Sequence, residues 1–71
     1  MTYTIRARDF NSQIYYLRGW DKKIPVWITE GQYNSGRAIQ EYARIDEVKE
    51  RIELIRKGEK KWKSLVIIEI H

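Results

Sequence analysis

Residues 45–58, IDEVKERIELIRKG, decide the fold of this chain. Their apolar positions follow one another at spacings of three, four and three, which places them on one stripe of a helix: Ile45, Val48, Ile52 and Ile55. The opposite face is charged, with Glu–Arg and Glu–Lys pairs four residues apart in the favourable order. Asp46 suits the first turn and Gly58 suits the end. The stretch therefore predicts an amphipathic helix that needs a second layer to pack against.

The beginning of this helix is ambiguous. Ala38 and Tyr42 extend the same stripe backwards, so one long helix from about residue 36 fits the pattern. Alternatively, residues 37–43 form a separate extended or helical piece. We favour a break near residues 43–45.

Three segments before the helix have the character of strands. Residues 3–8 alternate apolar and polar side chains, as a strand with one buried face does. Residues 13–20 are rich in aromatic and β-branched side chains. Residues 24–29 form a shorter segment in which Pro25 favours an edge position or the start of a strand. Together they predict an antiparallel meander.

The rest of the chain supplies connections and a last strand. Residues 30–36 hold two glycines and are expected to be a loop, and residues 59–63 form a basic linker. Residues 65–70 are first apolar on both faces, which favours an inner position in the sheet. We therefore expect one α+β domain over residues 1–71, with the order β-β-β-α-β, an antiparallel sheet of about four strands and one main helix on one face.

The composition fits a small intracellular domain. The chain has 71 residues and no cysteine, which excludes a disulfide framework or a thiolate metal site. It shows no signal peptide, and its longest apolar run, residues 65–68, is far too short to span a membrane. We expect a cytoplasmic protein. The net charge of +4 permits contact with nucleic acid or an acidic protein.

Catalytic chemistry has little support in the residues. The single histidine is His71, the last residue, and the serines stand in turns or at the starts of elements. Each carboxylate pair on the helix has a basic residue one turn away, as a solvated face does. No spacing resembles a zinc, calcium or phosphate-binding motif. We expect no enzymatic activity, no metal and no cofactor.

The outer face of the first hairpin is a candidate binding surface. A turn centred on residues 10–11 would put Ile5 opposite Tyr16, which makes these residues part of the core face. The other face would then carry Arg6, Arg8, Tyr15 and Leu17. Arginines beside an aromatic side chain can contact the phosphates or base edges of nucleic acid. The alternative is an ordinary solvated face, and a slip of one residue would invert the assignment.

The segment from Arg56 to Lys63 is a second candidate. It is basic and contains one indole, with Lys60, Lys61, Trp62 and Lys63 as its centre. Such residues can contact phosphate and stack on a base. Alternatively, Trp62 covers an edge of the core. A third candidate is the pair Trp20 and Trp27, which flank the second turn. They either pack at the rim of the core or, if exposed together, anchor a protein partner.

The layout of the chain resembles the short hypothetical proteins that phages and prophages encode. The resemblance rests on five pieces: Tyr3-Thr4-Ile5, Tyr16-Leu17, Trp27-Ile28-Thr29, Tyr42 followed by Ile45-Asp46-Glu47-Val48, and the closing strand Leu65–Ile70. It implies a phage accessory protein, which often blocks a host restriction, CRISPR or transcription component. The β-β-β-α order is also similar to the DNA-binding domains of tyrosine recombinases, from which the last strand departs. Both analogies concern the fold, and fold does not determine function.

Our leading hypothesis is a non-enzymatic binding module that inhibits or adapts a host protein. The first alternative is a small DNA- or RNA-binding domain that uses the hairpin face or the basic linker. The second is a structural or assembly protein that acts as a homodimer, because a core this small gains stability from association. We expect no membrane partner.

Overall fold

The structure, a computed structural model, describes residues 1–70 and confirms the α+β fold class. Its elements are β1 (Thr2–Asp9), β2 (Ile14–Asp21), β3 (Ile24–Thr29), α1 (Glu30–Asn34), α2 (Ile45–Gly58) and β4 (Trp62–Ile70). The strands form one antiparallel sheet in the order β3-β2-β1-β4, so the predicted meander of the first three strands is confirmed. The helix α2 begins at Ile45 and ends at Gly58, as the stripe predicts.

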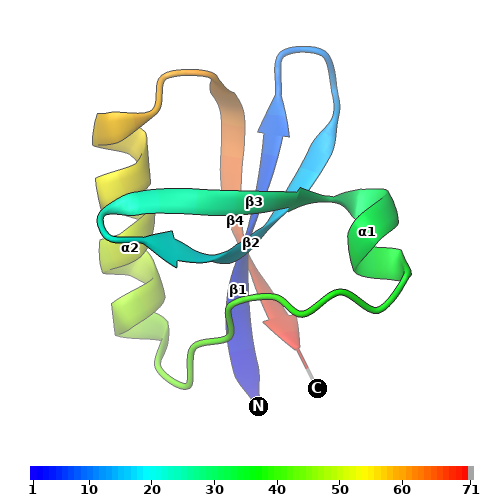
Figure 1. The fold of residues 1–71 in the computed structure, drawn as a ribbon. Coiled ribbons are helices and arrows are strands. Elements are labelled where there is room, and N and C mark those ends of the chain that lie inside the picture. The colour runs from blue at the N-terminus through cyan, green and yellow to red at the C-terminus, as the bar shows by residue number, and fades with distance from the viewer. Residues whose placement is uncertain (71) are drawn as a thin grey trace.

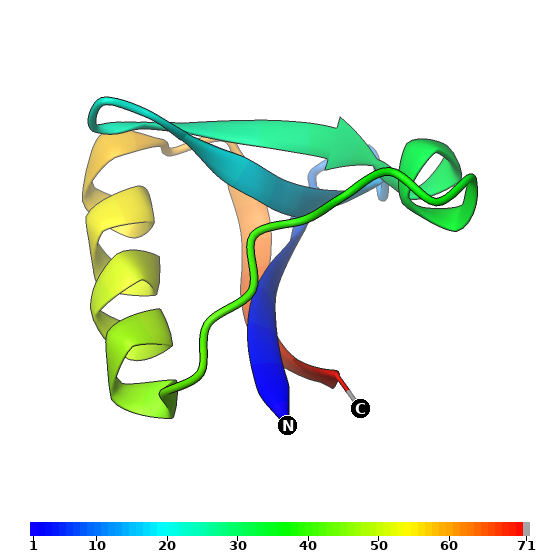
Figure 2. The ribbon, with the colours of Figure 1, turned by 60° about the horizontal axis from the view of Figure 1, so that its bottom comes forward.

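The sheet is strongly curved because β2 bends. β2 pairs with β1 at Ile14, Tyr15 and Tyr16, whereas its ladder with β3 runs from Tyr15 to Asp21. The register of this second ladder shifts between Leu17 and Gly19. Such a bulge kinks a strand and increases its twist. As a result β2 and β3 run across the direction of β1 and β4, and α2 stands along the open side (Figures 1 and 2).

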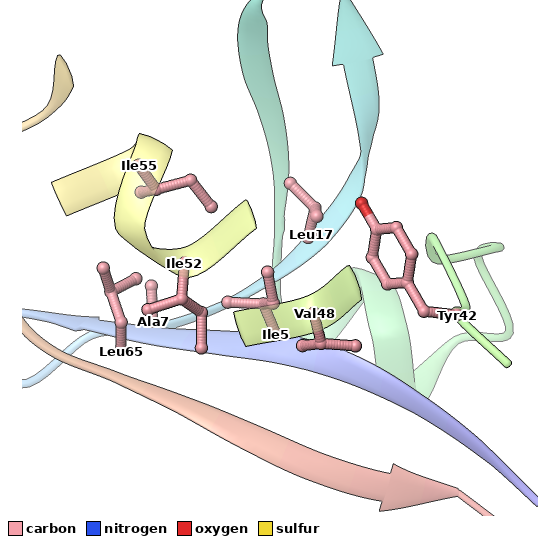
Figure 3. Close-up of a cluster of buried hydrophobic side chains, with 8 residues drawn as sticks. All are labelled: Ile5, Ala7, Leu17, Tyr42, Val48, Ile52, Ile55 and Leu65. Carbon is pink, nitrogen blue, oxygen red and sulfur yellow. The ribbon is translucent and has the colours of Figure 1, made fainter. Parts of the chain in front are cut away.

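The core fills the space between α2 and the concave side of this sheet (Figure 3). Its members come from α2, from three strands and from residues 37–43, the crossover segment that leads into α2: Ile5, Ala7, Leu17, Tyr42, Val48, Ile52, Ile55 and Leu65. Three of the four stripe residues, Val48, Ile52 and Ile55, are buried, whereas Ile45 remains exposed at the helix start. Each fully buried aliphatic side chain contributes about 2 kcal/mol to the free energy of folding, so burial of the stripe is the main interaction that holds α2 against the sheet.

The charged face of α2 differs in detail from the prediction. The sequence places Glu47 four residues before Arg51 and Glu53 four residues before Lys57. Neither pair is among the ion pairs of residues 1–70. Instead the Arg56 guanidinium bonds the Glu53 carboxylate at 2.7 Å, and Arg51 lies over the Trp20 ring at 5.4 Å from its centroid. An indole within reach competes with an exposed carboxylate for the guanidinium.

The expected loop at residues 30–36 contains the short helix α1. Thr29 and Gln32 form a capping box: the Gln32 N–H donates to the Thr29 hydroxyl, and the Thr29 N–H donates to the Gln32 side chain. The pattern Thr-x-x-Gln is a known helix-start signal that the sequence contains. The two glycines favoured a loop over a helix in the sequence. In the structure Gly36, at φ 92°, lies just beyond the end of α1.

Residues 37–43 are extended, so the break before α2 is confirmed and the single long helix is wrong. Backbone bonds join Tyr42 to Tyr3 in both directions at 2.8 Å, and the Gln40 N–H donates to Leu17 O at 2.7 Å. The buried Thr4 hydroxyl donates to Gln40 O at 2.7 Å. These bonds hold the crossover against the sheet without a helix.

The register of the first hairpin differs by one residue from the expectation. Arg6 pairs with Tyr16 and Ala7 with Tyr15, so Tyr15 and Leu17 lie on the core face. Leu17 is fully buried there. Arg6 and Arg8 do lie on the opposite face, but their expected partner Tyr15 does not. The neighbour they gain, Tyr16, is buried and stacked on Tyr33 at 4.1 Å.

β4 is an edge strand and not the inner strand that its apolar run suggested. It pairs with β1 alone, and β2 occupies the other side of β1. It also begins at Trp62, inside the expected linker. Its two apolar faces have different roles, because Leu65 is buried under α2 whereas Val66 points to the opposite face and remains 37% exposed.

Among residues 1–70, no helix has the length and apolar character that crossing a membrane requires.

Candidate functional site

An open pocket with a volume of about 470 Å³ lies where the β1–β2 turn approaches the start of β4. We call it the aromatic pocket, and its lining is Asp9, Phe10, Asn11, Tyr15, Trp27, Lys60, Lys61 and Trp62. Three of its aromatic rings are in contact: the centroid of the Trp62 ring lies 4.8 Å from that of Trp27 and 5.4 Å from that of Tyr15. Such contacts hold the rings in fixed positions.

The β1–β2 turn positions Phe10 at the mouth of the pocket. One carboxylate oxygen of Asp9 accepts the backbone N–H groups of Asn11 and Gln13, both at 2.9 Å. Ser12 takes a positive φ of 66° and donates its N–H to Asp9 O. Asp is a preferred residue for such a turn because its side chain substitutes for a backbone acceptor. Phe10 is consequently held outward and is 70% exposed.

Glu59 anchors both tryptophans of the pocket. Its Oε1 accepts the indole N–H of Trp62 at 2.8 Å and that of Trp27 at 3.1 Å. The Glu59 side chain is only 20% exposed, and Lys61 lies 3.9 Å from its other oxygen. A carboxylate that accepts several donors holds them more firmly than a neutral acceptor would. The indole nitrogens are therefore satisfied internally, and the ring surfaces remain for a ligand.

Two lysines give the pocket its positive charge. Lys61 Nζ lies 5.0 Å from the centroid of the Trp62 ring, in cation–π distance. Lys60 Nζ donates to the Arg56 carbonyl at 3.1 Å at the end of α2, where a cation is favoured. Asp9 is the acidic side chain in the lining. The lining thus combines exposed ring surface with two lysines and one acid, and Glu59 outside the lining is a second acid beside Lys61.

The structure brings together five of the residues that the sequence singled out. Tyr15, Trp27, Lys60, Lys61 and Trp62 all line the aromatic pocket. They were assigned to three separate surfaces, and the corrected register of the hairpin explains why Tyr15 joins them.

The other four predicted residues lie elsewhere. Arg6 and Arg8 are on the opposite face of the sheet. Lys63 lies in a neighbouring hollow with Arg56 and Glu59. Trp20 and Trp27 are not exposed together, since both are half-buried and pack against the core.

Trp20 belongs to a separate group, the Trp20 cluster, formed with Tyr42 and Arg51. Its indole N–H donates to the Tyr42 hydroxyl at 2.8 Å, and Arg51 covers the ring. Tyr42 is 6% exposed. Burial raises the pKa of this phenol, while the bond from Trp20 lowers it to a smaller extent. This cluster fastens the crossover to β2 and has a structural role.

Sequence reasoning missed Phe10 and Glu59. Phe10 stands in a turn of the form Asp-Phe-Asn-Ser, where a large exposed aromatic residue serves no local purpose. Glu59 is the one acid in the run Arg56–Lys63. Both signals are present in the sequence, but only the fold shows that the two segments meet.

Within residues 1–70, no group of three or more histidine, cysteine, aspartate or glutamate side chains is placed to hold a metal ion, and no buried side-chain polar atom lacks a partner. The pocket is suited to binding an apolar or aromatic group with adjacent negative charge. No protein-family model, curated protein or solved structure matches the chain. The fold and the pocket together define a small α+β domain with a preformed aromatic pocket.

Proposed function

We propose that this protein is a non-enzymatic binding module that holds a segment of a partner protein in the aromatic pocket and occludes the surface that supplies it. One observation carries the proposal: the rings of Phe10, Tyr15, Trp27 and Trp62 border an open pocket of about 470 Å³ while the indole nitrogens are already satisfied by Glu59. Because the rings of Tyr15, Trp27 and Trp62 already pack together, they lose little entropy when a ligand arrives.

The chemistry of the lining indicates the kind of segment. Aromatic side chains dominate the energy of protein interfaces when they bury an apolar anchor. Lys60 and Lys61 at the rim favour acidic residues beside that anchor. We therefore propose an apolar or aromatic side chain flanked by aspartate or glutamate. The resemblance to phage accessory proteins corresponds to the case in which the partner is a host protein.

Affinity capture with matched variants tests this proposal. The wild-type chain, Phe10→Ala and Ile24→Ala are immobilised and exposed to a bacterial lysate. Ile24 is a suitable control because it is 64% exposed, close to the 70% of Phe10, and does not line the pocket. We expect one specific protein on the wild type and on Ile24→Ala, and its loss from Phe10→Ala. Equal retention by all three chains, or no specific protein at all, overturns the proposal.

Single-stranded nucleic acid is the second candidate ligand. The two lysines beside the rings favour it, since bases stack on aromatic side chains while lysines contact phosphates. Arg6 and Arg8, however, lie on the other face of the sheet, so they do not extend the basic track of the pocket.

Salt dependence separates the two candidates. Two phosphate contacts in a single strand predict a slope of about −1.4 in log affinity against log salt concentration. Titration with short oligonucleotides, followed by tryptophan fluorescence, measures it. No quenching at low salt removes the nucleic-acid candidate.

A further inference from the structure

The free edge of β4 is unprotected. No segment within residues 1–70 pairs with its outer side, because β4 ends the sheet next to β1. At the opposite edge, β3 carries Pro25 and runs directly into α1. β4 has no proline or glycine, and no charge stands between Lys63 and Glu69. Edge strands normally carry such features because a bare edge pairs with another chain.

Hydrogen bonds at Tyr3 identify the backbone groups that face outward from β4. The N–H and C=O of Tyr3 both bond to Tyr42, so they point away from β4. Tyr3 lies opposite Glu69, which makes this a non-hydrogen-bonded pair of the ladder. In an antiparallel ladder the two kinds of pair alternate, so Leu65, Ile67 and Glu69 direct their N–H and C=O groups to the free edge.

The charges of β4 are arranged symmetrically around Val66. Lys63 stands three residues before Val66 and Glu69 three residues after it. Both side chains are exposed. If a second β4 runs antiparallel with a two-fold axis at Val66, Lys63 of each copy lies opposite Glu69 of the other. The same axis sets Leu65 opposite Ile67, two residues whose backbone groups face outward.

We propose that a second copy of this chain docks on this edge by antiparallel pairing of β4 with β4, with Val66 opposite Val66. The two sheets of four strands then form one continuous sheet. Backbone bonds between Leu65 and Ile67 provide the attraction, and the two Lys63–Glu69 pairs fix the register. This association goes beyond the ligand of the aromatic pocket, because the edge and the pocket use different residues.

The surroundings of the edge combine apolar and charged side chains. A groove of about 440 Å³ runs between α2 and β4, and its lining includes the apolar Ile52, Leu65 and Ile67 and three charged residues of α2: Lys49, Glu53 and Arg56. In the proposed register, the half-buried Ile67 of the second copy lies beside this groove. On the opposite face, Val66, which is 37% exposed, is covered by its own symmetry mate. Burial of this apolar surface adds to the backbone bonds.

A cysteine cross-link tests the axis. The chain contains no cysteine, so a single substitution gives an unambiguous product. Val66→Cys sets two thiols in a non-hydrogen-bonded pair with Cα atoms about 4.5 Å apart, within the range of a disulfide. Ile68→Cys on the same face is the control, since it would lie opposite Ser64. Under mild oxidation we expect a covalent dimer from Val66→Cys and little from Ile68→Cys. Equal or reversed yields overturn the register.

Charge reversal tests the pairing without a cross-link. Lys63→Glu sets two acids opposite each other at both ends, and Glu69→Lys sets two bases there. Sedimentation equilibrium should show that each single change weakens the dimer about tenfold or more, while the double change restores it. Phe10→Ala should leave the dimer intact, which separates this proposal from pocket binding. A wild type that stays monomeric at every concentration, or singles as dimeric as the wild type, overturns it.

Discussion

The Trp20 cluster and the aromatic pocket use the same kind of side chain for different purposes. In the Trp20 cluster one indole N–H bonds a buried phenol, and Arg51 covers the ring. In the aromatic pocket two indole N–H groups share one carboxylate, and the rings border open space. Both sets of indole nitrogens are satisfied. The difference lies in the ring surface, which neighbours cover in the cluster and leave accessible in the pocket.

The largest effect is expected for Trp20→Ala. The change removes the indole from the rim of the core and leaves the Tyr42 hydroxyl without its donor. We expect a loss of about 3 kcal/mol in the free energy of unfolding, as large aromatic truncations produce. Urea denaturation followed by circular dichroism measures this loss. A loss below about 1 kcal/mol would mean that the cluster does not fasten the crossover.

Glu59→Ala should have the next largest effect, because it strands two indole N–H groups at once. Charge-assisted bonds of this kind support a loss of about 2 kcal/mol. Glu59→Gln is the matched control, since it keeps an acceptor oxygen, and it should lose clearly less. Thermal unfolding compares the three chains. If the alanine and glutamine variants were equally unstable, the indole bonds would not be the reason for the loss.

Tyr42→Phe should lower the free energy of unfolding by about 1 kcal/mol at neutral pH. The phenylalanine ring keeps the packing of Tyr42 with Ile5 and Val48 in the core, but the Trp20 indole loses its acceptor. The combination Tyr42→Phe with Trp20→Ala should cost less than the two single losses added together, because each removes the same bond. Full additivity in urea denaturation would contradict a direct coupling between the two residues.

Alkaline pH should weaken the Trp20 cluster. Burial raises the pKa of Tyr42 above its ordinary value of 10.0, so the folded chain holds this proton more tightly than the unfolded chain. The contribution is therefore complete below about pH 10 and is lost as the pH rises through the folded pKa. Denaturation from pH 8 to pH 11 should show a steeper loss for the wild type than for Tyr42→Phe. Parallel curves would contradict the raised pKa.

The smallest effect on stability is expected for Phe10→Ala. Phe10 is 70% exposed, and the turn that carries it is held by Asp9, so the free energy of unfolding should change by no more than about 0.5 kcal/mol. Thermal unfolding checks this value. A larger loss would show that Phe10 packs against the domain and does not stand ready for a ligand.

The elements with strong local patterns were predictable from the sequence. The stripe of α2 depends on spacing alone, and the bounds of β3 follow from Pro25 and the turns on either side. The hairpin register was not predictable from the local pattern. It depends on two hydrogen bonds that the Asp9 carboxylate accepts from backbone N–H groups and on a positive φ at Ser12. A turn longer by one residue moves every side chain of β2 to the other face. That single step decides whether Tyr15 joins the pocket.

The position of β4 and the assembly of the pocket were beyond the local pattern for a different reason. An apolar strand can lie inside a sheet or at an edge that pairs with another chain. Only the strands that it pairs with distinguish these two positions. Phe10 and Trp62, which Glu59 holds in place, are far apart in the sequence and line one pocket because β4 returns beside β1. Residue types indicated aromatic binding surfaces, and the tertiary fold placed five of the predicted residues in one pocket.

The pairing of β1 with β4 has a consequence for how the chain is made. During synthesis β1 is made before β4, yet its ladder with β4 joins residues such as Thr2 and Ile70. The meander can form early, but one side of β1 has to wait for β4. Until β4 has been made, one side of the β1 backbone lacks its partner strand and the core lacks Leu65. A nascent chain paused before β4 should therefore be sensitive to protease.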